Sequence, residues 1–256
     1  MINLFSSLEM IHPEQICLHE EHEGARLDTT CSAIREEGVL RHPPLAMPIR
    51  DGRYLILDGA HRTCALQKLG CYRIPVQVVK GEDLRLEAWD HVVPEGSWLH
   101  ELRNYPSLHW TPTPNQARPV AVVRQANGER YFVYYQSSSV YHFHNLDMWH
   151  QMVRSYSKQY AVKRLPHSND FRLEPGLVRL SYPAYTVQQL EETVLAGKVM
   201  PAGVTRFMVN GRLLNLQIPL KLLLESQFVQ EEWNQYREQW ADSLRLYSEP
   251  VYLCEV

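Results

Sequence analysis

The residues best suited to chemistry in this sequence lie in one short bend, "DGAHR", at positions 58–62. The apolar run "YLIL" precedes the bend and a stretch with helical spacing follows it, so the bend falls where a strand meets a helix. The first turn of a helix presents unpaired N–H groups and a positive dipole end, which together stabilise a phosphate. Gly59 allows close approach, Arg62 offers a bidentate fork, His61 adds a donor, and Asp58 suits Mg2+ or its bound water. The bend therefore indicates an anion site.

The same bend also has a purely structural interpretation. Asp58 can cap the following helix while Arg62 lies in solvent. Neither the Walker pattern G-x-x-x-x-G-K-[ST] nor a G-x-G-x-x-G pattern occurs in the chain. On its own, the bend leaves both interpretations open.

The elements that must position this bend form a small α/β unit. Strands are expected at 14–20, which ends in His19 and Glu20, and at 54–58 and 72–79. Helices are expected at 26–38, with Gly38 as its end, and at 61–70. The proline-broken stretch "RHPPLAMPI" is predicted to be an edge strand or an extended link.

The second half of the chain predicts a further mixed α/β arrangement. A proline-rich stretch, 106–119, is typical of a linker, and two strands around Asn127-Gly128 follow it. The segment 201–219 is predicted to be a hairpin that turns at Asn210-Gly211. Helices are expected at 145–159, 186–197 and 231–247.

Composition narrows the function classes. The 256 residues are 45% hydrophobic and 21% charged, with a net charge of -3, which is typical of a soluble globular protein and argues against a nucleic-acid-binding one. The five cysteines form no C-x-x-C pair, which indicates reduced thiols. The N-terminus has no signal-peptide pattern, and no apolar run is long enough to cross a membrane. We therefore expect a cytoplasmic protein without a membrane partner.

The stretch "LDGAHRTCALQKLGCYRIPVQVV" resembles the phosphate-binding motif of the ParB/sulfiredoxin superfamily. Ala60 stands where sulfiredoxins carry their reactive cysteine, so the resemblance does not extend to sulfinic-acid repair. His61 replaces the first arginine of the G-E-R-R turn of chromosome-partitioning ParB proteins. A third branch of the superfamily fits better.

Over nearly its full length, the chain resembles the free L-serine kinases of that superfamily, above all those of staphyloferrin B siderophore biosynthesis. The stretches that carry this resemblance are "ICLHE", "GVLRHPPLAMPIRDGRYLILDGAHR", "LGCYRIPVQ", "WDHVVPEGSW", "MPAGVTRFMVNGRLLNLQIPL" and "EPVYLCEV". The resemblance implies an α/β (α+β) fold, with a ParB/sulfiredoxin-like nucleotide-binding domain at 1–105. A mixed α/β domain at 106–256 would complete the serine pocket.

The implied activity is phosphorylation of free L-serine to O-phospho-L-serine with ATP and Mg2+. The product would supply 2,3-diaminopropionate for a siderophore, and ADP stays open as an alternative donor. A neutral serine hydroxyl is a poor nucleophile, so a carboxylate that accepts its proton is needed. Glu20 matches the family's catalytic glutamate, although Glu21 and Glu23 lie in the same acidic run.

The resemblance also assigns the remaining site residues. Asp58 would hold the metal and orient the serine hydroxyl. The nucleotide phosphates would bind to Gly59, Ala60, His61, Arg62 and Thr63. The serine pocket would use Trp89, His91, Thr205 and Arg206, because a hydroxyl and a guanidinium fork suit a carboxylate.

The alternative function is a non-catalytic, ParB-like nucleotide-binding regulator of siderophore genes. Such a regulator would not need Glu20 or the pair Thr205 and Arg206. If it bound DNA, it should carry a basic stripe, and the sequence shows none. The cluster His142, His144 and His150 is interpreted as surface or interface histidines rather than as a metal or haem site. The aromatic helix at 231–247 is expected to form core or the face of a homodimer.

Overall fold

The computed structural model describes residues 4–21, 24–136, 143–167 and 171–247. The chain divides into two compact units: unit 1 is Met1–Arg85 with Val209–Val256, and unit 2 is Leu86–Met208. This division differs from the sequence-based boundary at residue 105, which placed everything after it in the second domain. The physical reason is that leucines after Val209, such as Leu213 and Leu223, are buried in the same core as strands near the N-terminus.

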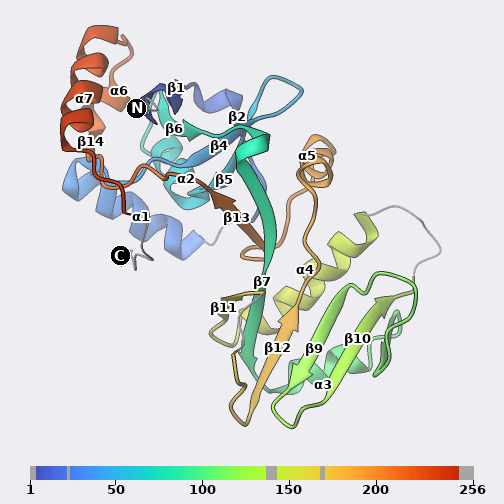
Figure 1. The fold of residues 1–256 in the computed structure, drawn as a ribbon. Coiled ribbons are helices and arrows are strands. Elements are labelled where there is room, and N and C mark those ends of the chain that lie inside the picture. Colours follow the sequence, from blue (N-terminus) through green and yellow to red (C-terminus); the bar gives the residue numbers. More distant parts are fainter. Residues whose placement is uncertain (1–3, 22–23, 137–142, 168–170, 248–256) are drawn as a thin grey trace. The chain divides into compact units, whose positions relative to one another are not determined.

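Unit 1 contains a five-stranded mixed sheet in the order β1-β6-β4-β5-β2 (Figure 1). The central residues of β5, which are Leu55, Ile56 and Leu57, are almost completely buried, as expected from a continuous apolar run. The strands and helices of the N-terminal part are β1 (Leu8–Ile11), β2 (Ile16–Leu18), α1 (Gly24–Glu37), β3 (Val39–Leu40), β4 (Leu45–Pro48), β5 (Tyr54–Asp58), α2 (Ala60–Lys68) and β6 (Ile74–Val78). The returning part adds β14 (Ile218–Pro219), α6 (Leu220–Leu224) and α7 (Gln230–Ser243).

The predicted helix ends in unit 1 are confirmed. Helix α1 ends at Gly38, whose φ is +68° and whose N–H donates to the Ile34 carbonyl at 3.0 Å. Gly70 ends α2 in the same conformation, with φ of +79°. Both glycines supply the left-handed backbone that residues with a Cβ rarely adopt.

The prediction of an edge strand or link at 41–49 is wrong. Strand β4 lies inside the sheet, antiparallel to β5 and parallel to β6. The prolines do not prevent this, because Pro43 and Pro44 precede the strand and Pro48 closes it. Pro44 even contributes to the pairing, since its carbonyl accepts from the Gln77 N–H at 2.8 Å.

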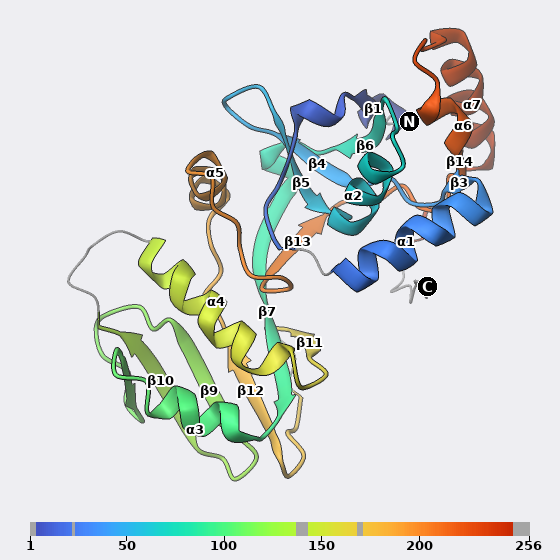
Figure 2. The ribbon, with the colours of Figure 1, turned by 180° about the vertical axis from the view of Figure 1, so that it is seen from behind.

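Unit 2 is built on a second sheet in the order β11-β7-β12-β9-β10-β8, with β13 also pairing with β7. Helices α3 and α4 lie against one face of this sheet (Figure 2). Its elements are β7 (Leu84–Pro94), α3 (Ser97–Arg103), β8 (Leu108–Thr111), β9 (Ala121–Gln125), β10 (Arg130–Tyr135), α4 (Phe143–Ser157), β11 (Lys163–Pro166), β12 (Leu177–Ser181), α5 (Val187–Leu195) and β13 (Thr205–Val209). The predicted hairpin at Asn127-Gly128 is confirmed as β9 and β10.

The predicted hairpin at 201–219 is wrong. Strand β13 pairs with β7 and not with the segment that follows it. After Val209 the chain is irregular, with positive φ at Gly211, Asn215 and Gln217. An Asn-Gly pair therefore marks a change of direction here without a returning strand.

In the part of the chain that is described, no helix has the length and apolar character needed to cross a membrane.

Candidate active site

Two predicted acidic residues lie at the same edge of the unit 1 sheet. Strands β2 and β5 are parallel neighbours, and Leu18 is paired with Ile56. Glu20 follows the end of β2 by two residues, and Asp58 is the last residue of β5, so both acids come at the carboxyl ends of these strands. The carboxyl ends of adjacent parallel strands are a common position for ligand-binding residues.

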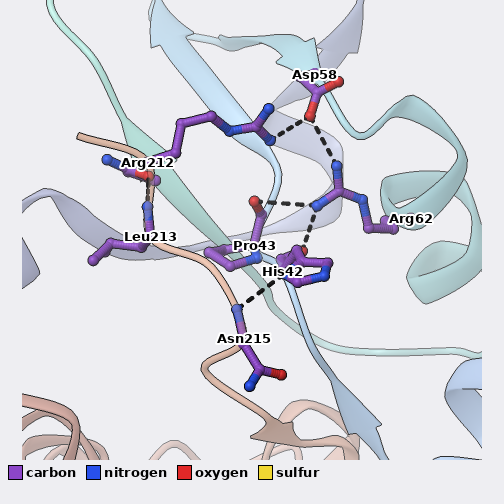
Figure 3. A network of polar contacts seen from close by, with 8 residues as sticks. His42, Pro43, Asp58, Arg62, Arg212, Leu213 and Asn215 are labelled. Carbon is purple, nitrogen blue, oxygen red and sulfur yellow. Dashed lines mark hydrogen bonds and ion pairs between the residues drawn. The ribbon is translucent and has the colours of Figure 1, made fainter. Parts of the chain in front are cut away.

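Asp58 is held by two arginines, which Figure 3 shows converging on one carboxylate oxygen. Its Oδ2 accepts from Arg62 Nη2 at 2.9 Å and from Arg212 Nη2 at 2.5 Å. Desolvation raises the pKa of this carboxyl, but the two guanidiniums outweigh it and hold the pKa below its ordinary value. Asp58 is therefore a stable carboxylate at neutral pH.

The purely structural interpretation of the bend required Arg62 to be a solvated surface charge, and the structure shows that it is not. Its side chain is only 15% exposed. Besides Asp58, it donates from Nη1 to the carbonyls of His42 at 2.6 Å and Pro43 at 3.4 Å (Figure 3). Asp58 does not cap α2 either, since the N-cap residue is Gly59 and no side chain caps the helix. Hydrogen bonds and ion pairs therefore hold the bend, and the first turn of α2 has no side-chain cap.

The first turn of α2 offers backbone donors. The first intrahelical bond runs from the Thr63 N–H to the Gly59 carbonyl at 2.9 Å, so the N–H groups of Ala60, His61 and Arg62 have no acceptor within the helix. Thr63 is completely buried, and its Oγ has no hydrogen-bond partner among the described residues. Its assignment to the nucleotide site stays a prediction, as do those of Gly59, Ala60, His61 and Arg62.

Gly59 is required by both its backbone and its surroundings. Its φ is +90°, and a Cβ there would lie 3.0 Å from Arg62 Nη2 and 3.1 Å from Pro44 Cα. We expect Gly59→Ala to lower the free energy of unfolding by about 1–3 kcal/mol and to weaken nucleotide binding. Urea unfolding and calorimetric titration with ADP measure the two effects.

Gly52→Ala is the matched control for this variant. Gly52 has a similar φ of +85°, but nothing lies within 4 Å of a Cβ built on it. The control therefore reports the backbone strain alone, and the difference between the variants reports the contacts with Arg62 and Pro44. Equal effects on unfolding and on ADP binding would contradict the prediction.

Glu20 lies beside a buried histidine. His19 donates from Nδ1 to the Ile56 carbonyl at 2.6 Å, because a carbonyl can only accept. Its Nε2 is then directed to Glu20, at 3.7 Å from Oε2. The Glu20 side chain is 23% exposed, so it is accessible to a small substrate. Of the alternatives in the acidic run, Glu21 is half-buried and Glu23 lies outside the described residues.

The predicted serine-binding residues lie in unit 2. Arg206 packs over the Trp89 ring, with its Cζ 4.7 Å from the ring centroid, and its Nη1 donates to Glu87 Oε2 at 2.7 Å. Thr205, its neighbour in β13, is buried. These contacts fix the Arg206 guanidinium in one orientation, but nothing in them tests whether it binds serine.

His91 is a buried histidine with both ring nitrogens in use. Its Nε2 donates to the Gly203 carbonyl at 2.8 Å, so Nδ1 accepts from the Tyr156 hydroxyl at 2.6 Å. Tyr156 in turn accepts from Tyr182 at 2.8 Å. Burial lowers the pKa of His91 to about 4, which keeps it neutral. A direct contact between His91 and serine would require one of these bonds to open.

Of the predicted histidine cluster, only the side chain of His150 is described, so its interpretation as surface or interface histidines stays a prediction. His150 Nε2 donates to the Val199 carbonyl at 2.8 Å. His142 and the side chain of His144 lie outside the described residues.

Sequence reasoning missed two residues of the Asp58 network. Arg212 lies in the irregular segment after β13, and Gln77 anchors this segment. The Nε2 of Gln77 donates to the Gly211 carbonyl at 2.7 Å, and the Oε1 of Gln77 accepts from the Leu213 N–H at 2.8 Å. His42 accepts from the Asn215 N–H on Nδ1 at 2.9 Å (Figure 3). The stretch "NGRLLN" predicts a turn from its residue types, and nothing in its spacing marks Arg212 as a site residue.

Arg212→Gln should make the protein less stable in acid. A carboxyl whose folded-state pKa is lowered stabilises the protein above its unfolded pKa, and this contribution is lost as the pH falls through the folded-state value. Without Arg212, the pKa of Asp58 rises, so the loss begins at a higher pH. Since the Asp58 side chain is 44% exposed, screening by solvent limits the change in the free energy of unfolding to less than about 1 kcal/mol.

Urea unfolding from about pH 3 to pH 7 measures this shift. Lys221→Gln, which removes an exposed cation from the same unit, is the control. Parallel pH profiles for Arg212→Gln and Lys221→Gln would contradict the prediction.

The chain is similar in sequence to several known proteins. Residues 7–89 match the ParB N-terminal domain. The ATP-dependent L-serine kinase SbnI of Staphylococcus aureus is 34% identical over 257 aligned residues, which cover 100% of both chains. An ATP-dependent L-serine kinase of Staphylothermus marinus is 32% identical over 83 residues, which are 31% of this chain and 33% of that protein.

Two solved structures are similar to this chain in fold. The structure of SbnI from Staphylococcus aureus with a C-terminal truncation has a TM-score of 0.81 at 31% identity, and the match covers 95% of this chain and 99% of that one. A free serine kinase in complex with AMP has a TM-score of 0.70 and covers 85% of this chain and 93% of its own. At 18% identity, the second likeness concerns the fold alone.

Proposed function

The chain belongs to the family of ATP-dependent L-serine kinases, and on that premise we propose that it phosphorylates free L-serine. The γ-phosphoryl group of ATP would pass to the serine hydroxyl, giving O-phospho-L-serine and ADP. The observation that supports this proposal is the edge of the unit 1 sheet where the parallel strands β2 and β5 end: Glu20 follows β2, and Asp58 closes β5 directly before the uncapped first turn of α2. A carboxylate base beside a phosphate-binding helix end is the arrangement that phosphoryl transfer requires.

Glu20 would act as the general base. The serine oxygen attacks the γ-phosphorus while its proton passes to the Glu20 carboxylate, and the bond from the γ-phosphorus to the bridging oxygen breaks. The electron pair of that bond leaves with ADP. The partial burial of Glu20 supports this role, since it limits competition from water.

The first turn of α2 would hold the nucleotide phosphates. The backbone N–H groups of Ala60, His61 and Arg62 supply donors, and Gly59 allows close approach. The guanidiniums of Arg62 and Arg212 meet at Asp58 and would neutralise phosphate charge from the same place. In unit 2, Trp89, Thr205 and Arg206 are proposed to bind the serine, and His91 would join them where its bond to Gly203 or to Tyr156 opens.

Asp58 fits the role of a Mg2+ ligand. Mg2+ in kinases is usually held by one or two carboxylates together with phosphate oxygens and water, so a single Asp beside the phosphate site is sufficient. The contacts with Arg62 and Arg212 use only Oδ2 of its carboxylate. When bound, the ion would neutralise charge on the phosphates, and Asp58 would keep its negative charge through the lowered pKa.

A product assay tests the proposal. The purified protein is mixed with L-serine, Mg2+ and either ATP or ADP, and O-phosphoserine is measured by mass spectrometry. We expect product with ATP and its loss in Glu20→Ala. Nucleotide binding without product with either donor would overturn the kinase proposal and favour a nucleotide-binding regulator.

The biological setting remains part of the proposal. O-phosphoserine from this reaction would supply 2,3-diaminopropionate to a siderophore pathway in the cytoplasm. Four described cysteines are unpaired, which is consistent with a reducing compartment. A homodimer is tested by light scattering on the purified protein.

A further inference from the structure

A row of cations crosses the face of the unit 2 sheet that faces away from α3 and α4. Arg130 on β10 is directly opposite Arg124 on β9, and Arg124 is directly opposite Arg179 on β12. The register continues through Val92 on β7, which is apolar and buried, to Lys163 on β11, which is exposed. Figures 1 and 2 show α3 and α4 against one face of this sheet, and His91, next to Val92 on β7, is on that face because its Nδ1 is bonded to Tyr156 of α4. Since side chains alternate along a strand, Val92 and the row are on the opposite face. The strands therefore align charges that are far apart in the sequence.

The row is only partly neutralised. Arg179 is buried and forms a two-pronged ion pair with Asp90, which is also completely buried. Arg124 and Arg130 are exposed, and neither has an ion pair with a carboxylate in the described part of the chain. Burial and the cations of Arg130 and Arg179 lower the pKa of Arg124.

Like charges directly opposite each other on neighbouring strands are destabilising. Arg130 packs its guanidinium over the Phe132 ring, a contact that does not require a second arginine directly opposite it at position 124. The repulsion between Arg124 and Arg130 would be relieved by an anion that binds both. The unneutralised pair therefore indicates a partner with negative charge.

We propose that this face, defined by Arg124, Arg130 and Lys163, binds an acidic segment of a partner protein. A guanidinium forms strong charge-assisted hydrogen bonds with a carboxylate, and Arg179 does so within the same row, where its Nε and Nη2 both contact Oδ2 of Asp90. Neighbouring strands lie about 4.8 Å apart. Alternate side chains of an extended segment are separated by about 7 Å, so two carboxylates can reach adjacent members of the row.

The surroundings of the row disfavour a nucleic acid. Single strands bind to proteins largely by stacking bases on aromatic faces. Here the Phe132 ring is covered by Arg130, with Cζ at 4.5 Å from its centroid, and the Phe171 ring by Lys163, with Nζ at 4.6 Å. The net charge of the chain is also -3, which opposes a long polyanion.

The probe is a short fluorescein-labelled peptide of alternating glutamate and threonine, and its binding is measured by fluorescence anisotropy at low salt. We expect binding to the full chain, weakened by added salt and lost when glutamine replaces glutamate in the peptide. Arg124→Gln/Arg130→Gln should weaken it by about tenfold or more. Arg154→Gln/Lys158→Gln, which removes two exposed cations at α4, is the matched control.

The melting temperatures of the variants show whether a loss of peptide binding is caused by unfolding. Because Arg124→Gln/Arg130→Gln removes a like-charged pair, its melting temperature should be unchanged or higher by roughly 1–3 °C. Arg130→Glu is the second variant: it places opposite charges across the strands and should also abolish peptide binding in a folded protein.

Three results would overturn the proposal. One is the absence of peptide binding to the wild-type chain, and another is unchanged affinity in Arg130→Glu. The third is binding of a single-stranded oligonucleotide or of tripolyphosphate at this face without binding of the peptide. None of these measurements depends on kinase turnover, so the proposal can fail while the kinase assignment stands.

Discussion

Glu20→Gln should lower the kcat of serine phosphorylation by about 100- to 10,000-fold, the range expected when a general base is removed. The amide keeps the size of the side chain and its position beside His19 but cannot accept the proton of the serine hydroxyl. The KM for serine should change little, because the substitution leaves the proposed serine-binding residues of unit 2 intact. Steady-state kinetics with mass-spectrometric detection of O-phosphoserine measure both constants.

Glu21→Gln is the matched control for Glu20→Gln, because it removes the neighbouring carboxylate from the same acidic run. We expect it to retain most of the activity. A large loss in Glu21→Gln with a small loss in Glu20→Gln would show that the base had been assigned one position too early. Raising the pH should restore little activity to Glu20→Gln, since the serine hydroxyl itself is a very weak acid.

Asp58→Asn should separate turnover from nucleotide binding. The substitution removes a negative charge from beside Arg62 and Arg212, so the phosphates of ADP should bind as tightly as before or more tightly. Turnover should nevertheless fall by about 100-fold or more, because the proposed Mg2+ ion would lose its carboxylate ligand and the serine hydroxyl would lose the group proposed to orient it. Calorimetric titration with ADP and the product assay measure the two effects.

Asp51→Asn is the control for this prediction. Asp51 also pairs with an arginine, Arg53, at 2.8 Å, but it lies in the turn at the opposite end of β5. It should leave both ADP binding and turnover unchanged. If Asp58→Asn lost ADP binding and turnover together, Asp58 would act mainly by holding the bend in shape.

Several local elements of the fold could be predicted from the sequence, but the pairing of strands that are distant in the sequence could not. The buried strand β5 and the glycine ends of α1 and α2 follow from residue type and spacing, and these predictions are confirmed. Proline content misled the assignment of β4, because the two prolines before the strand do not interrupt its pairing. Which strands pair is decided by contacts between distant residues, which a single sequence does not reveal.

The same limit applies to the site. Asp58 and Arg62 are four residues apart, so their pairing lies within the reach of sequence analysis. Arg212 joins them from a segment 154 positions after Asp58, and only the folded chain brings it there. The aligned arginines of unit 2 were missed for the same reason, since each stands alone in its own strand and no basic run marks them.

The division of unit 1 into two stretches of chain has a consequence for synthesis on the ribosome. Its core includes Leu216, Ile218 and Trp233, so it cannot close until those residues have been translated. Unit 2 is continuous in the chain and emerges complete before them. We therefore expect the later-coded unit to fold first, the reverse of the usual N-terminal-first order. The early strands of unit 1, which carry Glu20 and Asp58, must wait for their partners with apolar surface exposed, the stage at which a chaperone would bind.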